Sequence, residues 1–219
     1  MSEYRALAAY EGEAAREYER TRFRSMRGRL TDGLEWRLIR RGLGRLGWRD
    51  GEDVRVLDVP VGTGRMASRL SRAGCTVTGI DASADMLSEA TSRSSASRYL
   101  LGRIEELPLD SASVDYAVCV RLFGHLPPDA KDAALRELAR VSARGCVVCF
   151  PGDTRLLRAR RSRQARSGRR LDSWFPMSRR HAEAMARAAG FADAETLAIL
   201  GPFGETRALV LHSPRGPRG

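Results

Sequence analysis

The fold of this chain is decided by the stretch V-R-V-L-D-V-P-V-G-T-G, which runs from Val54 to Gly64. Its first half is rich in apolar and β-branched residues, which predicts a buried strand over residues 54–59. The glycines at its end predict a tight turn, and a helical pattern follows over residues 64–72. A second apolar run, over residues 75–80, is followed by Asp81. This order of strand, glycine turn, helix, strand and carboxylate is typical of a site for a nucleotide-like cofactor.

Strands and helices continue to alternate along the chain, which predicts a doubly wound α/β sheet. Further strands are expected over residues 98–101, 114–120, 146–150, 195–200 and 207–212, with helices over residues 83–95, 129–141 and 178–189. The last two strands are joined by only six residues, G-P-F-G-E-T, too few for a parallel crossover. The predicted fold is therefore a seven-stranded, mostly parallel sheet with an antiparallel terminal hairpin.

The N-terminal 50 residues precede the first strand and are expected to form a helical arm or cap. Gly28 is expected to end a first helix, and Thr31 and Asp32 to begin a second. Residues 51–219 would then form the main domain. The sequence has no apolar run of about 18 residues that could span a membrane. It also has no apolar signal region near residue 1, so we expect a cytoplasmic protein.

The net charge of +11 comes from 38 lysine and arginine residues against 27 acidic residues, and Lys131 is the only lysine. Arg155 to Arg170 contains eight arginines and no acidic residue. Without this segment the net charge would fall to +3. The excess charge is therefore local, and an arginine-rich insertion is expected at about residues 153–175.

Two cofactors compete for the glycine turn. Read as G-x-G-x-x-A, ending at Ala67, the turn could hold the pyrophosphate of NAD, with Asp81 on the ribose. Read as D-x-P-x-G-x-G, starting at Asp58, it resembles the first motif of class I S-adenosylmethionine-dependent methyltransferases. A carboxylate at Asp58 would repel a pyrophosphate but suits the amino group of an amino acid.

The resemblance to class I methyltransferases extends through three further motifs. They are D-A-S-A-D-M-L from Asp81, G-R-I-E-E-L-P-L-D-S-A-S-V-D-Y-A-V from Gly102, and R-L-F-G-H-L from Arg121. The last is similar to the loop after the fourth strand in the small-molecule branch related to ubiquinone and menaquinone biosynthesis. The expected terminal hairpin is the topological mark of the same family.

The resemblance implies a set of contacts with S-adenosylmethionine. Asp58 would hold the amino group, and Asp81 would accept hydrogen bonds from both ribose hydroxyls. Tyr18 and Arg22, one helical turn apart, would lie near the carboxylate, although an amphipathic helix with an aromatic core face explains them equally well. The full implied set is Asp58, Pro60, Gly62, Thr63, Gly64, Asp81, Ala82, Met86, Arg103, Ile104, Glu105, Tyr18 and Arg22.

Two positions depart from the family pattern. Pro60 replaces the first glycine of the turn, which a negative φ would allow. Arg103 stands where the family has an aspartate that accepts from the adenine amino group, and an arginine cannot accept that bond. Either Glu105 or a backbone carbonyl takes over this contact, or the adenine pocket is weakened.

His125 is the candidate general base for methyl transfer. It follows the fourth predicted strand, at the edge where such folds bind ligands. A structural or substrate-packing role explains it equally well, whereas His181 and His212 are expected to be structural. Arg121 and Phe123 in the same loop are expected to contact the substrate. No motif for methylating DNA bases follows the fourth strand, which argues against a DNA methyltransferase.

Cys146 and Cys149 have C-x-x-C spacing but lie on a predicted strand. Their side chains would face opposite sides of the sheet, so we expect core residues rather than a metal or redox pair. No other cluster of histidine, cysteine and acidic residues has metal-ligand spacing, and the cysteines are expected to be reduced.

Four interpretations of the arginine-rich segment stay open. It could bind an anionic small substrate through residues such as Arg155 and Arg158, or rest on an anionic membrane surface. It could also contact RNA phosphates, or be a solvated face. We favour an anionic acceptor or surface, because no aromatic residue for stacking on bases is interleaved with the arginines before Trp174 and Phe175. The sequence thus indicates methylation, most readily at oxygen, of a small-molecule or lipid-linked acceptor. The alternatives are an RNA-associated methyltransferase or RNA-binding protein and an NAD-dependent oxidoreductase.

Overall fold

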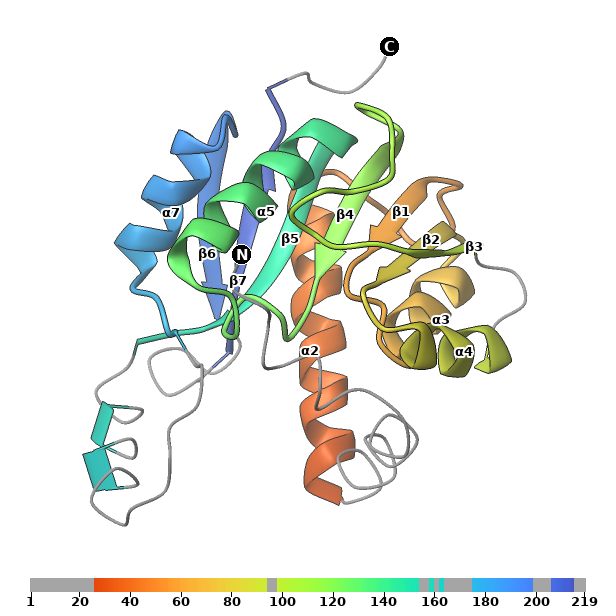
Figure 1. Ribbon diagram of the computed structural model, residues 1–219, viewed down its shortest axis with the longest axis horizontal. Coiled ribbons are helices and arrows are strands. Elements are labelled where there is room, and N and C mark those ends of the chain that lie inside the picture. The colour runs from red at the N-terminus through yellow and green to blue at the C-terminus, as the bar shows by residue number, and fades with distance from the viewer. Residues whose placement is uncertain are drawn as a thin grey trace.

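A central sheet of seven strands runs through the computed structural model, which describes residues 26–93, 98–153, 158–159, 162–163, 175–198 and 206–214 (Figure 1). The strands are β1 (Arg55–Asp58), β2 (Thr76–Asp81), β3 (Arg98–Leu101), β4 (Val114–Cys119), β5 (Ser142–Pro151), β6 (Asp193–Ala198) and β7 (Thr206–His212). Their order across the sheet is β3-β2-β1-β4-β5-β7-β6.

The first five strands are parallel, and β7 pairs antiparallel with both β5 and β6. β7 therefore lies between its sequence neighbour β6 and the parallel part of the sheet, with Val147 opposite Val210. Both parts of the fold prediction, the doubly wound parallel sheet and the antiparallel terminal hairpin, are confirmed.

Helices cover both faces of the sheet (Figure 1). They are α2 (Met26–Arg45), α3 (Arg65–Arg72), α4 (Ala84–Arg93), α5 (Pro128–Val141) and α7 (Arg179–Ala188). Buried residues of α5 and α7 share one core cluster, and those of α2, α3 and α4 share the other. Successive strand residues alternate between the two clusters, because side chains along a strand point to opposite faces.

The C-x-x-C pair follows this alternation. Cys146 belongs to the cluster under α5 and α7, and Cys149 to the cluster under α2 and α3. All four cysteines are free and buried. The two thiols therefore lie on opposite faces of the sheet as core residues, as predicted.

Helix α2 differs from the expected pattern. It begins at Met26 and continues through Gly28, so the expected break at that glycine is wrong. Its second half is part of the core: Leu38, Ile39 and Leu43 are almost fully buried. Gly42 allows close packing there, since a Cβ would lie 2.9 Å from the methyl carbons of Val147.

The first half of α2 projects beyond the sheet at the end where the parallel strands finish (Figure 1). Leu30 in this half is 66% exposed. Within the described ranges, no helix combines the length and the apolar character needed to cross a membrane.

Candidate functional site

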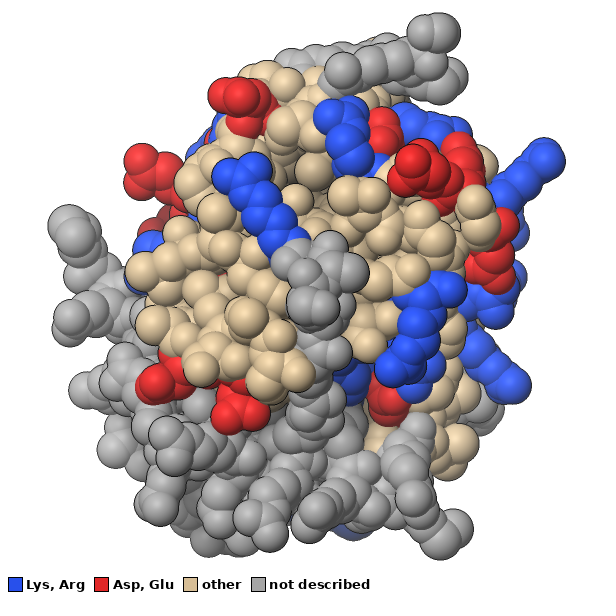
Figure 2. Space-filling view, turned by 90° about the vertical axis from the view of Figure 1, so that its right-hand side faces the viewer, with Lys and Arg blue, Asp and Glu red and all other residues tan. Residues whose placement is uncertain are grey.

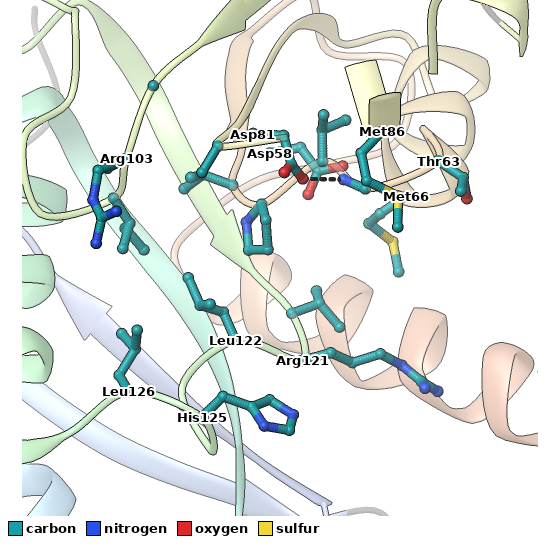
Figure 3. A pocket seen from close by; sticks show the side chains of 18 of the residues that line it. Asp58, Thr63, Met66, Asp81, Met86, Arg103, Arg121, Leu122, His125 and Leu126 are labelled. Carbon is teal, nitrogen blue, oxygen red and sulfur yellow. Dashed lines mark hydrogen bonds between the residues drawn. The ribbon is translucent and has the colours of Figure 1, made fainter. Parts of the chain in front are cut away.

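A cavity of about 160 Å³ opens at the carboxyl edge of the sheet, where β1, β2 and β4 end (Figure 3). Its walls come from the turn after β1, the start of α4, residues 102–105, and the loop after β4. Ligands of open α/β sheets bind at this edge. Four segments that are distant in the sequence therefore meet around one cavity.

Asp81, at the end of β2, is held by the backbone on both sides. One carboxylate oxygen accepts from the amide of Gly62 at 2.8 Å, and the other from the amide of Ser83 at 3.0 Å. Ser83 in turn accepts from the amide of Met86, which caps the start of α4. Burial raises the pKa of the Asp81 carboxyl, although these amide hydrogen bonds oppose the shift. The carboxylate thus has a fixed orientation at the cavity wall.

Asp58, at the end of β1, is 1% exposed and also lines the cavity. Neither of its carboxyl oxygens has a hydrogen-bond partner among the described residues. Burial raises the pKa of this carboxyl to about 8, and the nearby charge of Asp81 adds to the rise. The amide of Ala67 lowers the pKa in part without completing a hydrogen bond. A buried carboxyl group without a partner is the natural counterpart of a cationic ligand group.

The turn between these carboxylates depends on glycine conformations. Gly62 and Gly64 have φ values of 53° and 76°. A Cβ at Gly64 would lie 3.0 Å from the backbone of Ala90 in α4, so Gly64 lets α3 and α4 pack closely. Gly62 and Thr63 line the cavity, whereas Gly64 lies behind the wall.

Residues 103–105 form the far end of the cavity, where the adenine contacts are predicted. The Arg103 guanidinium lies 3.5 Å from Glu105 Oε1, and the Arg103 side chain is 46% exposed. Figure 3 shows Arg103 at the edge of the site, away from Asp58 and Asp81. Ile104 is buried, with 3% of its surface exposed. Arg103 is therefore engaged with the neighbouring acid that could replace the family's aspartate.

The loop after β4 forms the opposite wall. Leu122, His125 and Leu126 line the cavity beside Arg121 (Figure 3). Phe123 does not: its ring is fully buried in the core and is not among the lining residues. The expected substrate position for Phe123 is therefore corrected to a core position, because the loop turns this ring toward the sheet while its neighbours face the cavity.

Arg121 belongs to an ion-pair network that joins α2 to the cavity. Its guanidinium contacts both carboxylate oxygens of Glu35, at 3.1 and 2.8 Å. Arg65 contacts Glu35 at 3.0 Å and also pairs with Asp32, which pairs with Arg69 as well. Glu35 is 4% exposed. Since Arg65 and Arg121 both line the cavity, α2 supplies acids that fix two cationic side chains of its lining.

The structure brings most of the predicted site residues together. Those that line the cavity are Asp58, Pro60, Gly62, Thr63, Asp81, Ala82, Met86, Arg103, Ile104, Glu105, Arg121 and His125. Arg158 is exposed and lies 3.4 Å from Asp153. Tyr18, Arg22 and Arg155 lie outside the described residues. The sequence interpretation missed the lining residues Arg65, Met66, Leu122 and Leu126. Whether these side chains face the cavity depends on the turns around them, which the sequence pattern does not define.

Comparisons with known proteins agree with this geometry. Residues 56–145 match a family model described as a methyltransferase domain. The chain is 39% identical over 97 residues to a malonyl-[acyl-carrier protein] O-methyltransferase of Pectobacterium atrosepticum, covering 44% of this chain and 38% of that protein. The Salmonella typhimurium protein of the same name is 36% identical over 148 residues, covering 66% of this chain and 52% of that protein. A magnesium protoporphyrin IX methyltransferase from Synechocystis PCC 6803, solved with bound SAH, superposes with a TM-score of 0.74 at 16% identity, covering 94% and 96% of the two chains. This chain contains a class I S-adenosylmethionine-dependent methyltransferase domain.

The class I domain uses S-adenosylmethionine, and the cavity fits this cofactor. The partnerless oxygens of Asp58 suit its ammonium group, and the fixed Asp81 carboxylate suits its ribose hydroxyls. Both curated relatives are longer than this chain, which spans 38% and 52% of their lengths.

Proposed function

We propose that this protein transfers the methyl group of S-adenosylmethionine to an oxygen atom of an anionic acceptor. The observation that carries the proposal is one cavity with two chemically different walls. The buried acids Asp58 and Asp81 form the cofactor wall, and His125 and Arg121 lie on the facing loop. An acceptor that enters beside this loop would meet a cation as well as a side chain able to accept a proton.

S-adenosylmethionine supplies a methyl group on a positively charged sulfur, which an oxygen nucleophile displaces in line. The protein's part is to align the two reactants and exclude water. Asp58 and the Gly62 turn would orient the amino acid end, and Asp81 the ribose. Leu122 and Leu126 would keep the reacting centre dry. Arg121, held by Glu35, would attract the acceptor anion without swinging freely.

The acceptor we propose is a carboxylate carried on a larger molecule, such as an acyl group bound to a carrier protein. Two relatives are named as O-methyltransferases of malonyl-[acyl-carrier protein], which supports this class of acceptor. The net charge of +11 is compatible with an acidic carrier. A carboxylate is already ionised at neutral pH, so it needs no general base, whereas a hydroxyl does.

The cofactor assignment is tested by calorimetry with S-adenosylhomocysteine and with NADH. We expect the first to bind and the second not to bind. Asp81→Asn should weaken binding by about 10- to 100-fold, the effect of losing charge-assisted hydrogen bonds to the ribose. Glu106→Gln, at an exposed acid outside the cavity, is the matched control. NADH binding that disappears in Asp81→Asn would instead identify an oxidoreductase.

The acceptor class is tested by mass spectrometry of malonyl-carrier and malonyl-pantetheine after incubation with the protein and S-adenosylmethionine. A gain of one methyl ester supports the proposal. If both malonyl compounds keep their original mass, the proposal is refuted. His125→Ala should leave S-adenosylhomocysteine affinity intact. With a carboxylate acceptor its kcat should fall less than about tenfold, whereas loss of a base for a hydroxyl acceptor costs about 100-fold or more.

A further inference from the structure

Lys131 is the only lysine among the 38 lysine and arginine residues of the chain. It lies in the first turn of α5 and is 3% exposed. Burial lowers the pKa of its ammonium group to about 8. An arginine could not replace it simply, because the guanidinium is larger and stays charged when buried. Position 131 therefore suits a narrow side chain that ends in a compact hydrogen-bond donor, as lysine does.

The partner of Lys131 is the residue at which the chain returns after the arginine-rich segment. Lys131 Nζ donates to the carbonyl oxygen of Phe175 at 2.9 Å, and it also lies 5.4 Å from the centre of the Phe175 ring. The amide of Phe175 donates to the carbonyl oxygen of Gly124 at 2.7 Å. Both the amide and the carbonyl group of Phe175 are thus hydrogen-bonded, although 40% of the residue is exposed.

These contacts lie beside the acceptor wall of the cavity, by which we mean the lining residues Arg121, Leu122, His125 and Leu126 of the loop after β4. Gly124 immediately precedes His125 in the loop after β4, and that loop leads through Pro127 into α5. Two residues beyond Phe175, Met177 pairs with the end of β5: its amide donates to Pro151, and its carbonyl accepts from Asp153. The chain therefore leaves the sheet at Asp153 and returns at Phe175 across the carboxyl ends of β4 and β5.

We propose that Lys131 is a positioning residue for the acceptor wall. By holding Phe175 against Gly124, it fixes the loop that carries His125 and anchors the return of the arginine-rich segment beside the cavity. The wall would then keep its shape while an acceptor binds. The effect on acceptor binding rests on the proposed function, whereas the effect on the loop itself does not.

The direct test is hydrogen exchange of the Phe175 amide in the full chain, comparing wild type with Lys131→Met. The methionine keeps the length and apolar stem of the side chain but removes the donor. Exchange at Phe175 should rise about tenfold, the effect of one lost hydrogen bond on local opening. The Ala182 amide in α7, which donates to the carbonyl oxygen of the N-cap residue Ser178, is the internal reference and should not change. The imidazole NMR signals of His125 should also shift.

Arg136→Met is the matched control, because Arg136 is an exposed cation on the same helix. It should leave Phe175 exchange and the His125 signals unchanged. Unchanged exchange and unchanged His125 signals in Lys131→Met would overturn the proposal. If Lys131→Met does not fold, Phe175→Leu removes the ring contact at a partly exposed position. Exchange at residue 175 should then rise about threefold, and no change would again overturn the proposal.

The functional readout separates positioning from a general structural role. In Lys131→Met the KM for malonyl-carrier should rise about fivefold, with S-adenosylhomocysteine affinity within about twofold of wild type. A parallel loss of cofactor affinity would indicate a structural role and refute the proposal. If the wild type methylates neither malonyl-carrier nor malonyl-pantetheine, the proposed function fails, and Phe175 exchange with the His125 signals still decides the role of Lys131.

Discussion

The carboxyl group of Asp58 couples the stability of the cofactor-free protein to pH. Burial raises its pKa from 3.8 to about 8, so the folded chain holds a proton that the unfolded chain releases. Between these two values the folded state binds more protons than the unfolded state, and stability therefore falls as pH rises. The stabilising effect of protonation is fully present only at low pH, and it is lost as pH approaches 8.

Asp58→Asn should remove this dependence. We expect the variant to be more stable than wild type at pH 8, by an amount that shrinks by about 1 kcal/mol for each pH unit on going down toward pH 5. Urea unfolding at several pH values measures the difference. Parallel curves for the two proteins would show that Asp58 does not titrate in this window.

The same carboxyl group should release a proton when the cofactor product binds. The ammonium group of S-adenosylhomocysteine, placed beside Asp58, would favour the ionised carboxylate and lower its pKa. At pH 7 we expect about half a proton or more to be released in wild type and none in Asp58→Asn. Calorimetry in two buffers with different ionisation enthalpies gives this number. Equal proton release by both proteins would show that the ammonium group does not bind beside Asp58.

At the scale of single residues, the sequence predicts those site residues that belong to a short, continuous motif. Asp58 and Asp81 end adjacent parallel strands, so their meeting follows from the strand pattern alone. Which neighbours face the cavity was harder to predict. Leu122 lines it and Phe123 enters the core, and only the turn after β4 decides between them. The link between Lys131 and Phe175 joins residues 44 apart and has no sequence signal.

Among the elements, α2 carries a role that its sequence did not reveal. The sequence predicts two helices here, one that ends at Gly28 and one that begins at Thr31 and Asp32, whereas the structure has one helix from Met26 to Arg45. The helix continues because its second half packs into the core, and the cost of a single glycine is about 1 kcal/mol. Its first half can therefore reach the carboxyl edge of the sheet and place Glu35 between Arg65 and Arg121.

Glu35→Gln should destabilise the protein, because it removes the buried carboxylate that Arg65 and Arg121 share, and Arg65 keeps only its pair with Asp32 among the ion pairs described above. We expect a loss of about 3 kcal/mol in the free energy of unfolding, measured in urea. Arg37→Gln, an exposed position on the same helix, should change stability by less than about 0.5 kcal/mol. A Glu35→Gln variant as stable as wild type would mean that the arginines find other partners or solvent.

Over the whole molecule, charge is distributed unevenly. The face formed by β3, α3 and α4 shows basic and acidic side chains next to one another (Figure 2). The sequence places the excess of eight positive charges in residues 155–170, between β5 and α7. Phe175, which follows this segment, donates its amide to Gly124 in the loop that carries His125, and Asp153, which precedes the segment, pairs with Met177. An anionic carrier whose acyl group enters beside this loop would therefore be close to Phe175, the residue at which the described chain resumes after the segment.

Salt should then weaken the binding of the malonyl-carrier but not the binding of the malonyl group on a small thiol such as pantetheine. Long-range attraction is screened as the Debye length falls from about 10 Å at 0.1 M salt to about 3 Å at 1 M. We expect the KM for malonyl-carrier to rise about tenfold between 50 and 300 mM NaCl, and the KM for malonyl-pantetheine to change less than about twofold. Replacing the exposed Arg158 and Arg163 together by alanine should reduce the salt dependence. A KM for the carrier that is independent of salt would exclude electrostatic docking, and inhibition by single-stranded RNA at low salt would favour a nucleic-acid partner instead.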